Sequence, residues 1–249
     1  MLEIKNISFS FGKSEVLKNV SFNAESGKCT VLLGVNGEGK TTLLKCICGI
    51  LRPKTGEVTY NGKNILKLSS SGRAHIISYV PQSARFADID VFNTVLSGRR
   101  TCAGHIMTAK DTEKAADAIE LLGLSDLADK SAKTLSGGEQ RKLAVARALC
   151  TDADIIIMDE PLANLDLGSE TSLTKTIRQL CQNTGKTFIV TMHDLSLSTR
   201  FADKFVMLKD GTVFAEGDES IISKENIRSV YGINADIIKQ NGHTVVVPE

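Results

Sequence analysis

Apolar and polar side chains alternate along the first 24 residues, and Gly12 separates two such runs. This period of two predicts an antiparallel β layer. Residues 29–33 are almost continuously apolar, which is typical of a parallel strand covered on both faces. A glycine-rich loop follows, and apolar residues then recur at helical spacing at Leu44, Ile47, Cys48 and Leu51. The pattern therefore predicts a strand, a loop and a helix in direct succession.

Later segments repeat this alternation of strands and helices. A short hairpin is predicted over residues 56–64 and a strand over 76–80, after which residues 83–149 are helical in character. Thr108 and Asp111 have the spacing of a capping box. Strands are predicted at 155–158 and 187–192, with a helix between them that carries Leu173, Ile177, Leu180 and Cys181 on one face. The natural interpretation is a parallel β/α architecture.

Two glycine-containing turns predict tight hairpins near the end of the chain. Asp210-Gly211 lies between residues 205–208 and 213–215, and Asn241-Gly242 precedes the apolar residues 244–247. Both dipeptides favour the positive backbone angles of two-residue hairpin turns.

The composition narrows the class of protein. Hydrophobic residues make up 42% of the chain and charged residues 24%, and the net charge of +1 gives no general attraction to nucleic acid, so we expect no nucleic-acid partner. Apolar runs such as 155–158 are too short to span a bilayer, and residues 1–5 do not begin an export signal. We expect a cytoplasmic protein with reduced cysteines that serve as packing residues, because its six cysteines form no CxxC pair.

Residues 34–42 form the clearest chemical motif. Their sequence GVNGEGKTT fits G-x-x-x-x-G-K-[ST], in which glycines let backbone N–H groups surround phosphate oxygens. Lys40 would neutralise phosphate charge and the Thr41 hydroxyl would bind Mg²⁺. The alternative is a glycine-rich turn with a solvated lysine, but the position between a strand and a helix favours nucleotide binding. The predicted contacts are Gly34, Asn36, Gly37, Gly39, Lys40, Thr41 and Thr42.

A pair of carboxylates follows the apolar strand at 155–158. Ligands of parallel sheets bind at the carboxyl ends of strands, where Asp159 and Glu160 stand. The alternative is a strand that ends in a solvated turn. With a phosphate loop upstream, Asp159 is predicted to hold Mg²⁺ and Glu160 to orient and deprotonate the attacking water.

A second helix start lies at Leu135-Ser136-Gly137-Gly138-Glu139, with Ser136 at the cap position. It is either a simple glycine-rich helix start or a second anion site, because open backbone N–H groups and the helix dipole favour negative charge there. A dimer in which each such end faces the nucleotide of the other chain would use both sites.

In their order along the chain, these motifs resemble those of ATP-binding-cassette (ABC) ATPases. The resemblance implies a P-loop NTPase of the α/β class, with a RecA-like parallel-sheet core, an N-terminal antiparallel β subdomain and an inserted α-helical subdomain. The whole chain, 1–249, would be one nucleotide-binding domain, with the helical subdomain at about 83–149 and a short C-terminal extension at 218–249. The implied cofactors are ATP and Mg²⁺.

The same resemblance assigns further residues. Phe11 matches the aromatic residue that stacks on adenine, Gln82 the glutamine that senses Mg²⁺ and water, and His193 the histidine that reaches the γ-phosphate. Two copies would close head to tail over two ATP molecules, with Ser136, Gly137 and Gly138 of one chain facing Lys40 and Thr41 of the other. Phe11 could instead be a core aromatic. The chain departs from the common pattern at Glu139, where glutamine is more general, and at Leu162 and Ala163.

Three features resemble the importers of iron chelates, haem and cobalamin. They are Gly98-Arg99-Arg100, Leu165-Asp166-Leu167 and residues 225–233. The resemblance implies membrane permease subunits as partners, an external substrate-binding protein that acts indirectly, and a place on the cytoplasmic face of the cell membrane. Residues 83–100 would receive the permease, although Ile89, Val91, Phe92 and Val95 could be helix core and the two arginines a solvated helix end.

Two other classes of function would leave different patterns in the sequence. A soluble ABC ATPase that assists assembly or repair often carries long insertions or tandem cassettes, and this chain has neither. A nucleotide-binding module that never turns over would be expected to lack Glu160 or His193.

Overall fold

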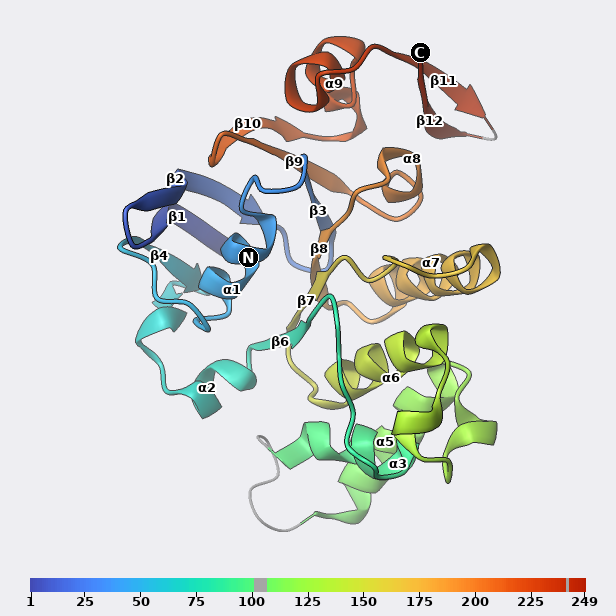
Figure 1. The fold of residues 1–249 in the computed structure, drawn as a ribbon. Helices are drawn as coiled ribbons and strands as arrows, with labels where there is room; N and C mark the ends of the chain where they lie inside the picture. The colour runs from blue at the N-terminus through green and yellow to red at the C-terminus, as the bar shows by residue number, and fades with distance from the viewer. Residues whose placement is uncertain (101–106, 241) are drawn as a thin grey trace. The chain divides into compact units, whose positions relative to one another are not determined.

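The computed structural model describes residues 1–100, 107–240 and 242–249, so Cys102, one of the six cysteines, and Asn241 of the second predicted turn lie outside the described part. The chain forms two compact units, one of residues 1–68 and 181–249 and the other of residues 69–180 (Figure 1). The five described cysteines carry no disulfide, and four of them are buried. Every helix in the described ranges is too short or too polar to cross a lipid bilayer.

The first unit begins with an antiparallel sheet in the order β2-β1-β4-β5. Leu2, Ile4, Ile7 and Phe9 of β1 are buried and alternate with more exposed residues except at a register shift between Ile4 and Ile7, and β1 pairs antiparallel with β2, which confirms the predicted antiparallel layer. The hairpin predicted at 56–64 is also present. The elements are β1 (Leu2–Phe11), β2 (Ser14–Ala24), β4 (Thr55–Tyr60), β5 (Lys63–Asn64) and the short helix η1 (Ile65–Lys67).

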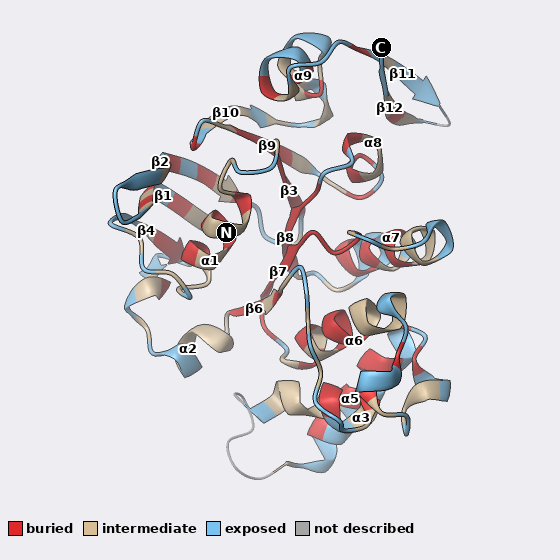
Figure 2. Ribbon diagram, in the orientation of Figure 1, coloured by how far each residue is buried: buried red, intermediate tan, exposed pale blue. Residues whose placement is uncertain are grey.

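A set of buried strands lies in the same unit. Strand β3 pairs in parallel with β8 and β9, and β10 returns antiparallel to β9 through the predicted turn at Asp210-Gly211. Every residue of β3 and β8 is buried (Figure 2), as the apolar run at 29–33 predicted for β3. The elements are β3 (Cys29–Leu33), α1 (Lys40–Ile47), β8 (Thr187–Thr191), α8 (Leu195–Ser198), β9 (Lys204–Lys209) and β10 (Thr212–Gly217).

The end of the chain adds a helix and a hairpin to the first unit. Ile227 and Val230 of α9 are buried, and the helix contacts β9 and β11. Strands β11 and β12 pair antiparallel from Ala235↔Pro248 to Gln240↔His243, which confirms the second predicted hairpin. The elements are η5 (Glu219–Ile221), α9 (Lys224–Tyr231), β11 (Ala235–Gln240) and β12 (His243–Pro248).

The second unit combines two parallel strands with a group of helices. Strand β6 pairs with β7 in parallel, and α3, α5 and α6 contact one another. The last residues of α7, from Cys181, belong to the first unit. The elements are α2 (Ser70–Ala74), β6 (Ile77–Val80), α3 (Val91–Leu96), η2 (Ser97–Arg99), α5 (Ala109–Leu121), η3 (Ser125–Leu127), η4 (Ala132–Thr134), α6 (Gly137–Cys150), β7 (Ile155–Asp159) and α7 (Leu167–Asn183).

The capping box predicted at the start of α5 is present. The Thr108 side chain accepts from the Asp111 amide, and the Asp111 carboxylate accepts from the Thr108 amide at 2.9 Å. The core interpretation of the segment before it is confirmed for Val91 and Val95, which are fully buried. It is wrong for Ile89, which is 45% exposed.

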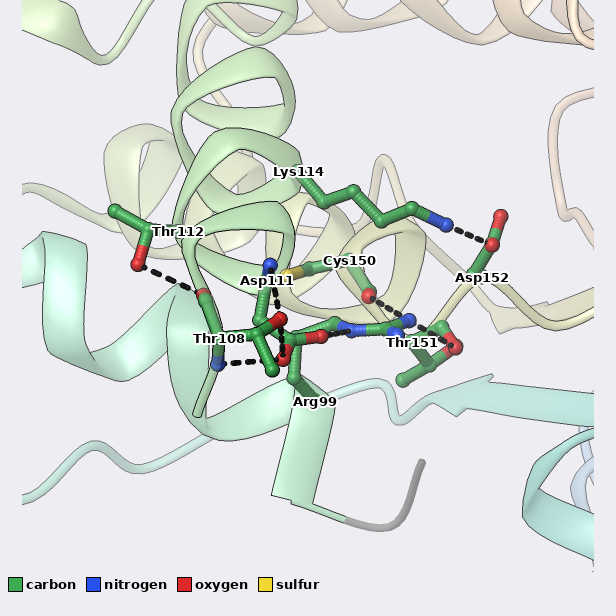
Figure 3. A network of polar contacts seen from close by, with 8 residues as sticks. All are labelled: Arg99, Thr108, Asp111, Thr112, Lys114, Cys150, Thr151 and Asp152. Carbon is green, nitrogen blue, oxygen red and sulfur yellow. Dashed lines mark hydrogen bonds and ion pairs between the residues drawn. The ribbon is translucent and has the colours of Figure 1, made fainter. Parts of the chain in front are cut away.

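One interpretation of Gly98-Arg99-Arg100 expected a helix end with solvated arginines, and for Arg99 this interpretation is wrong. Its Nε donates to Asp111 Oδ1 at 2.7 Å, and its Nη1 donates to the carbonyls of Cys150 and Thr151, each at 3.2 Å (Figure 3). The Arg99 side chain is only 12% exposed. It therefore joins the start of α5 to the end of α6, whereas Arg100 is exposed.

Candidate active site

The glycine-rich loop that follows the buried strand β3 has several positive φ angles. Gly34, Gly37 and Gly39 have φ values of 143°, 92° and 88°, a region that glycine adopts without steric cost. A Cβ on Gly34 would lie 2.6 Å from the Leu208 carbonyl oxygen, and one on Gly39 would lie 2.9 Å from Leu17. The glycines at these two positions are thus required by close packing as well as by the turn.

Lys40 lies inside this loop. Its Nζ donates to the carbonyl oxygens of Gly34 at 2.6 Å and Val35 at 3.0 Å, and the residue is 5% exposed. Helix α1 starts at Lys40, and its N-cap residue Gly39 provides no side-chain hydrogen bond. Such a helix start, with an ammonium group beside it, is suited to an anion such as phosphate. Thr41 and Thr42 follow in the first turn and are partly buried, while Asn36 is exposed.

His193 starts from the same edge of the sheet. Leu32 pairs with Thr191 in the parallel β3–β8 register, so Gly34 and His193 each come two residues beyond a paired position. His193 is exposed, and the next residue, Asp194, caps α8 by accepting from the Leu197 amide at 2.8 Å. The sheet register therefore explains how a residue far from the phosphate loop in sequence comes to this edge.

Phe11 lies at the end of β1 and is 56% exposed, so the core interpretation of this residue is wrong. Its ring meets the ring of Phe9 edge to face, with centroids 4.8 Å apart. Phe9 is the core aromatic, at 8% exposed. Phe11 thus presents an exposed aromatic surface on a supported ring.

The second unit holds the two carboxylates. Asp159 is fully buried and accepts a hydrogen bond from the Tyr79 hydroxyl at 3.1 Å, while Glu160 accepts from Gln82 Nε2 at 2.6 Å. Val80 pairs with Met158 in the parallel register, so Gln82 and Glu160 each lie two residues further along. Glu160 also has a φ of 46°, a conformation that costs a non-glycine residue roughly 1 to 3 kcal/mol.

Arg141 and Tyr79 also contact this group, and the sequence analysis singled out neither. Arg141 Nη1 donates to the Pro81 carbonyl at 3.1 Å. Burial lowers the pKa of its guanidinium, while the carboxylates of Glu160 and Asp159 raise it. Arg141 also lines a cavity of about 210 Å³ together with Gln82, Gly137 and Asn164. Its position one helical turn into α6 was a usable signal, but Tyr79 stands in no motif.

The predicted N-cap of α6 is confirmed, and it forms a complete capping box. Ser136 Oγ accepts from the Glu139 amide at 3.4 Å, and Ser136 donates from both its amide and its hydroxyl to Glu139 Oε2, each at 2.7 Å. These bonds lower the pKa of Glu139. A Cβ on Gly138 would lie 2.6 Å from Ser169 Oγ, whereas one on Gly137 would meet open space.

The residues that depart from the common pattern lie next to this region. Leu162 is buried at 6% exposed, and Ala163 is half-buried. Asp166, which is retained, accepts from Ser169 Oγ at 2.6 Å. A hydrophobic side chain at 162 therefore suits its buried position.

Each unit thus assembles part of the predicted set. The phosphate loop, Lys40, Thr41 and His193 belong to the first unit, and Gln82, Asp159, Glu160 and Ser136 belong to the second. The predicted Mg²⁺ ligands, Thr41, Gln82 and Asp159, supply a hydroxyl, an amide and a carboxylate. Oxygen donors of this kind fit Mg²⁺.

Comparison with known proteins identifies the class. The sequence profile of the ABC transporter family matches residues 17–163. The chain belongs to this family, and it is an ATP-binding cassette that hydrolyses ATP.

Two relatives and one solved structure illustrate the similarity. The chain is 40% identical to an uncharacterised ABC transporter ATP-binding protein of Methanocaldococcus jannaschii, over 100% of this chain and 98% of that protein. It is 33% identical to a hemin import ATP-binding protein of Bordetella avium, over 95% and 94% of the two chains. The fold matches a chain of a metal-chelate type ABC transporter in an inward-facing conformation, with a TM-score of 0.86, 26% identity and coverage of 100% and 96%.

Proposed function

We propose that this chain is the ATPase subunit of an importer for an iron chelate, haem or a cobalamin-type ligand. The similarity to a hemin import protein and to a metal-chelate type transporter supports this substrate class. Two copies of the chain act together on the cytoplasmic face of the membrane beneath permease subunits, and an external binding protein delivers the ligand. Residues 83–149 form the helical subdomain, 83–100 within it contact the permease, and 218–249 are the C-terminal extension.

The observation that carries the ATPase assignment of individual residues is the 2.6 Å contact between Gln82 and Glu160. It holds a buried carboxylate at the end of β7, next to Asp159. Glu160 accepts a proton from water while the water oxygen attacks the γ-phosphorus of ATP. The bond from that phosphorus to the bridging oxygen breaks, and ADP and phosphate are the products.

The remaining roles follow from the chemistry of the side chains. Lys40 and the loop amides of Gly34, Asn36, Gly37, Gly39 and Thr42 hold the phosphates, Phe11 stacks on adenine, and His193 contacts the γ-phosphate. Thr41, Gln82 and Asp159 are the Mg²⁺ ligands. The bound Mg²⁺ supplies charge neutralisation at the phosphates.

Ser136, Gly137 and Gly138 act on the nucleotide of the second copy. The Ser136 hydroxyl and the start of α6 offer hydrogen bonds and a positive dipole end to the γ-phosphate held by the partner's loop. ATP therefore closes the dimer, and hydrolysis with product release reopens it. These two motions drive the permease.

The test uses Glu160→Gln, which keeps an acceptor oxygen for Gln82 but removes the base. We expect ATP binding to remain and turnover to fall by a factor on the order of 10² to 10⁴. Tagged Glu160→Gln protein, held closed by ATP and Mg²⁺, is then purified from detergent-solubilised source membranes. Recovery of a permease whose transport activity on iron chelates, haem or cobalamin requires this chain supports the importer.

Lys40→Ala is the matched control, because its loss of nucleotide binding should abolish the ATP-dependent capture. Wild-type turnover in Glu160→Gln would remove Glu160 as the base. Recovery of only soluble dimers or a soluble partner would leave the ATPase in place and contradict the importer.

A further inference from the structure

The first glycine of the phosphate loop is held by the C-terminal extension. The Gly34 amide donates to the Tyr231 hydroxyl at 3.0 Å, and the carbonyl of the same Gly34 accepts from Lys40 Nζ at 2.6 Å. The backbone N–H and C=O of the buried Gly34 are therefore both hydrogen-bonded, the N–H to the extension and the C=O to the phosphate-binding lysine. All three residues belong to the first unit.

Tyr231 is placed by well-packed neighbours. It is the last residue of α9, which begins at the Ser223 cap and ends before Gly232 at a φ of 72°. Ile227 and Val230 on the same helix are 0% and 6% exposed. Burial raises the pKa of Tyr231 to about 12, so the phenol stays neutral near pH 7. The hydroxyl is thus held at a defined position by a rigid element.

Gly34, whose amide binds Tyr231, is also confined by strand β9. Gly34 packs so closely against β9 that a Cβ would lie 2.6 Å from the Leu208 carbonyl oxygen. The Gly34 peptide is therefore held between β9 and the Tyr231 hydroxyl. The Gly34 amide and carbonyl belong to the two peptide groups that flank its α-carbon, so contacts that fix this α-carbon and the preceding peptide group set the point from which the carbonyl reaches the Lys40 ammonium.

We propose that Tyr231 is a positioning residue for nucleotide binding, which orders the phosphate loop through the Gly34 amide so that Lys40 is set for the phosphates of ATP. The inference rests on the proposed role of Lys40. It extends the nucleotide site to a segment at 224–231, beyond the part of the chain that the family profile matches. A loop that is ordered before binding loses less conformational entropy when ATP arrives.

The test removes only the hydroxyl. In Tyr231→Phe the ring still packs, but the buried Gly34 amide loses its acceptor, so we expect the Kd for ATP to rise roughly five- to tenfold. KM for ATP should rise in parallel while kcat at saturating ATP stays within about twofold, because the lost interaction serves binding rather than chemistry. Hydrogen exchange of the Gly34 amide should become faster. Tyr60→Phe, the same change on β4 of the same unit, is the matched control and should leave all three quantities unchanged.

The outcomes separate this inference from the site itself. Lys40→Ala is measured alongside, and if it bound ATP as the wild type does, the phosphate-loop assignment would fail. If Lys40→Ala lost binding while Tyr231→Phe kept the wild-type Kd and Gly34 exchange rate, only the positioning role would be overturned. A Tyr231→Phe protein with an unchanged Kd for ATP but with both a lower kcat and a lower melting temperature would also overturn it. That pattern is expected of a residue that only supports the fold.

Discussion

Glu139 accepts hydrogen bonds from Ser136, the serine that caps α6. Its carboxylate accepts from both the amide and the hydroxyl of Ser136, and these bonds lower its pKa, so it is ionised at neutral pH. A negative charge at this helix start stabilises α6 through the helix dipole. The same charge opposes the phosphates that we propose to bind there.

Glu139→Gln should therefore tighten the ATP-driven dimer. Glutamine can still complete the capping box, but like-charge repulsion is removed, so we expect roughly three- to fivefold tighter dimerisation at low salt and a smaller gain at high salt. Sedimentation of the dimer in a Glu160→Gln background measures this. Glu120→Gln removes the same charge from an exposed position on α5 and should change nothing. Weaker or unchanged dimerisation would place Glu139 away from the bound phosphates.

Motif residues could be predicted from the sequence, whereas their supporting contacts could not. Lys40 and Glu160 stand in local patterns whose spacing is itself the signal. Tyr79, Arg141 and Tyr231 act through contacts that exist only after strands and helices have paired, and Tyr231 lies 197 residues from the glycine that it binds. No local pattern in one sequence predicts such a pair.

At the scale of elements, Asp111 connects two helices of the second unit. The Thr108 amide and hydroxyl and the Arg99 guanidinium together lower the pKa of Asp111 from 3.8 to about 2. Because the folded pKa lies below the unfolded value, this carboxylate stabilises the fold above about pH 4, and the contribution is lost as the pH falls from about 4 to 2.

Asp111→Asn should lower the melting temperature at pH 7 by roughly 5 to 10 °C, because it leaves the Arg99 charge largely buried without its carboxylate. The difference between the variant and the wild type should shrink as the pH is lowered from 4 toward 2. Circular dichroism melts at a series of pH values measure both effects. Asp117→Asn, at an exposed position of the same helix, is the control. A constant difference across this range would mean that the Asp111 carboxylate does not titrate with the pKa inferred from its contacts.

The ends of helices and strands could be predicted from the sequence where neighbouring residues determine them. The capping box at Thr108 and the hairpin turn at Asp210-Gly211 depend on residues two or three apart, and both are present. The burial of Arg99 was not predictable. Its partners are 12, 51 and 52 residues away, so neighbouring residues gave no indication that this arginine closes the end of another helix.

At the scale of the whole molecule, one chain carries two helix starts suited to phosphate. Helix α1 begins after the glycine loop in the first unit, and α6 begins after its cap Ser136 in the second. A single ATP has one γ-phosphate. A head-to-tail pair of chains gives both helix starts a nucleotide to bind, which is why we propose the dimer as the hydrolysing unit.

Ser136→Arg should prevent that dimer from forming. The long cationic side chain fills the place of the partner's γ-phosphate, while the monomer loses only its helix cap, at a cost of about 1 kcal/mol. In a Glu160→Gln background we expect ATP to bind the monomer with a Kd within about twofold of the parent, but size-exclusion chromatography to show no ATP-dependent dimer. Ser69→Arg removes the cap of α2 instead and should dimerise normally. Dimers that persist in Ser136→Arg would show that the start of α6 lies outside the nucleotide interface, and the composite site would have to be abandoned.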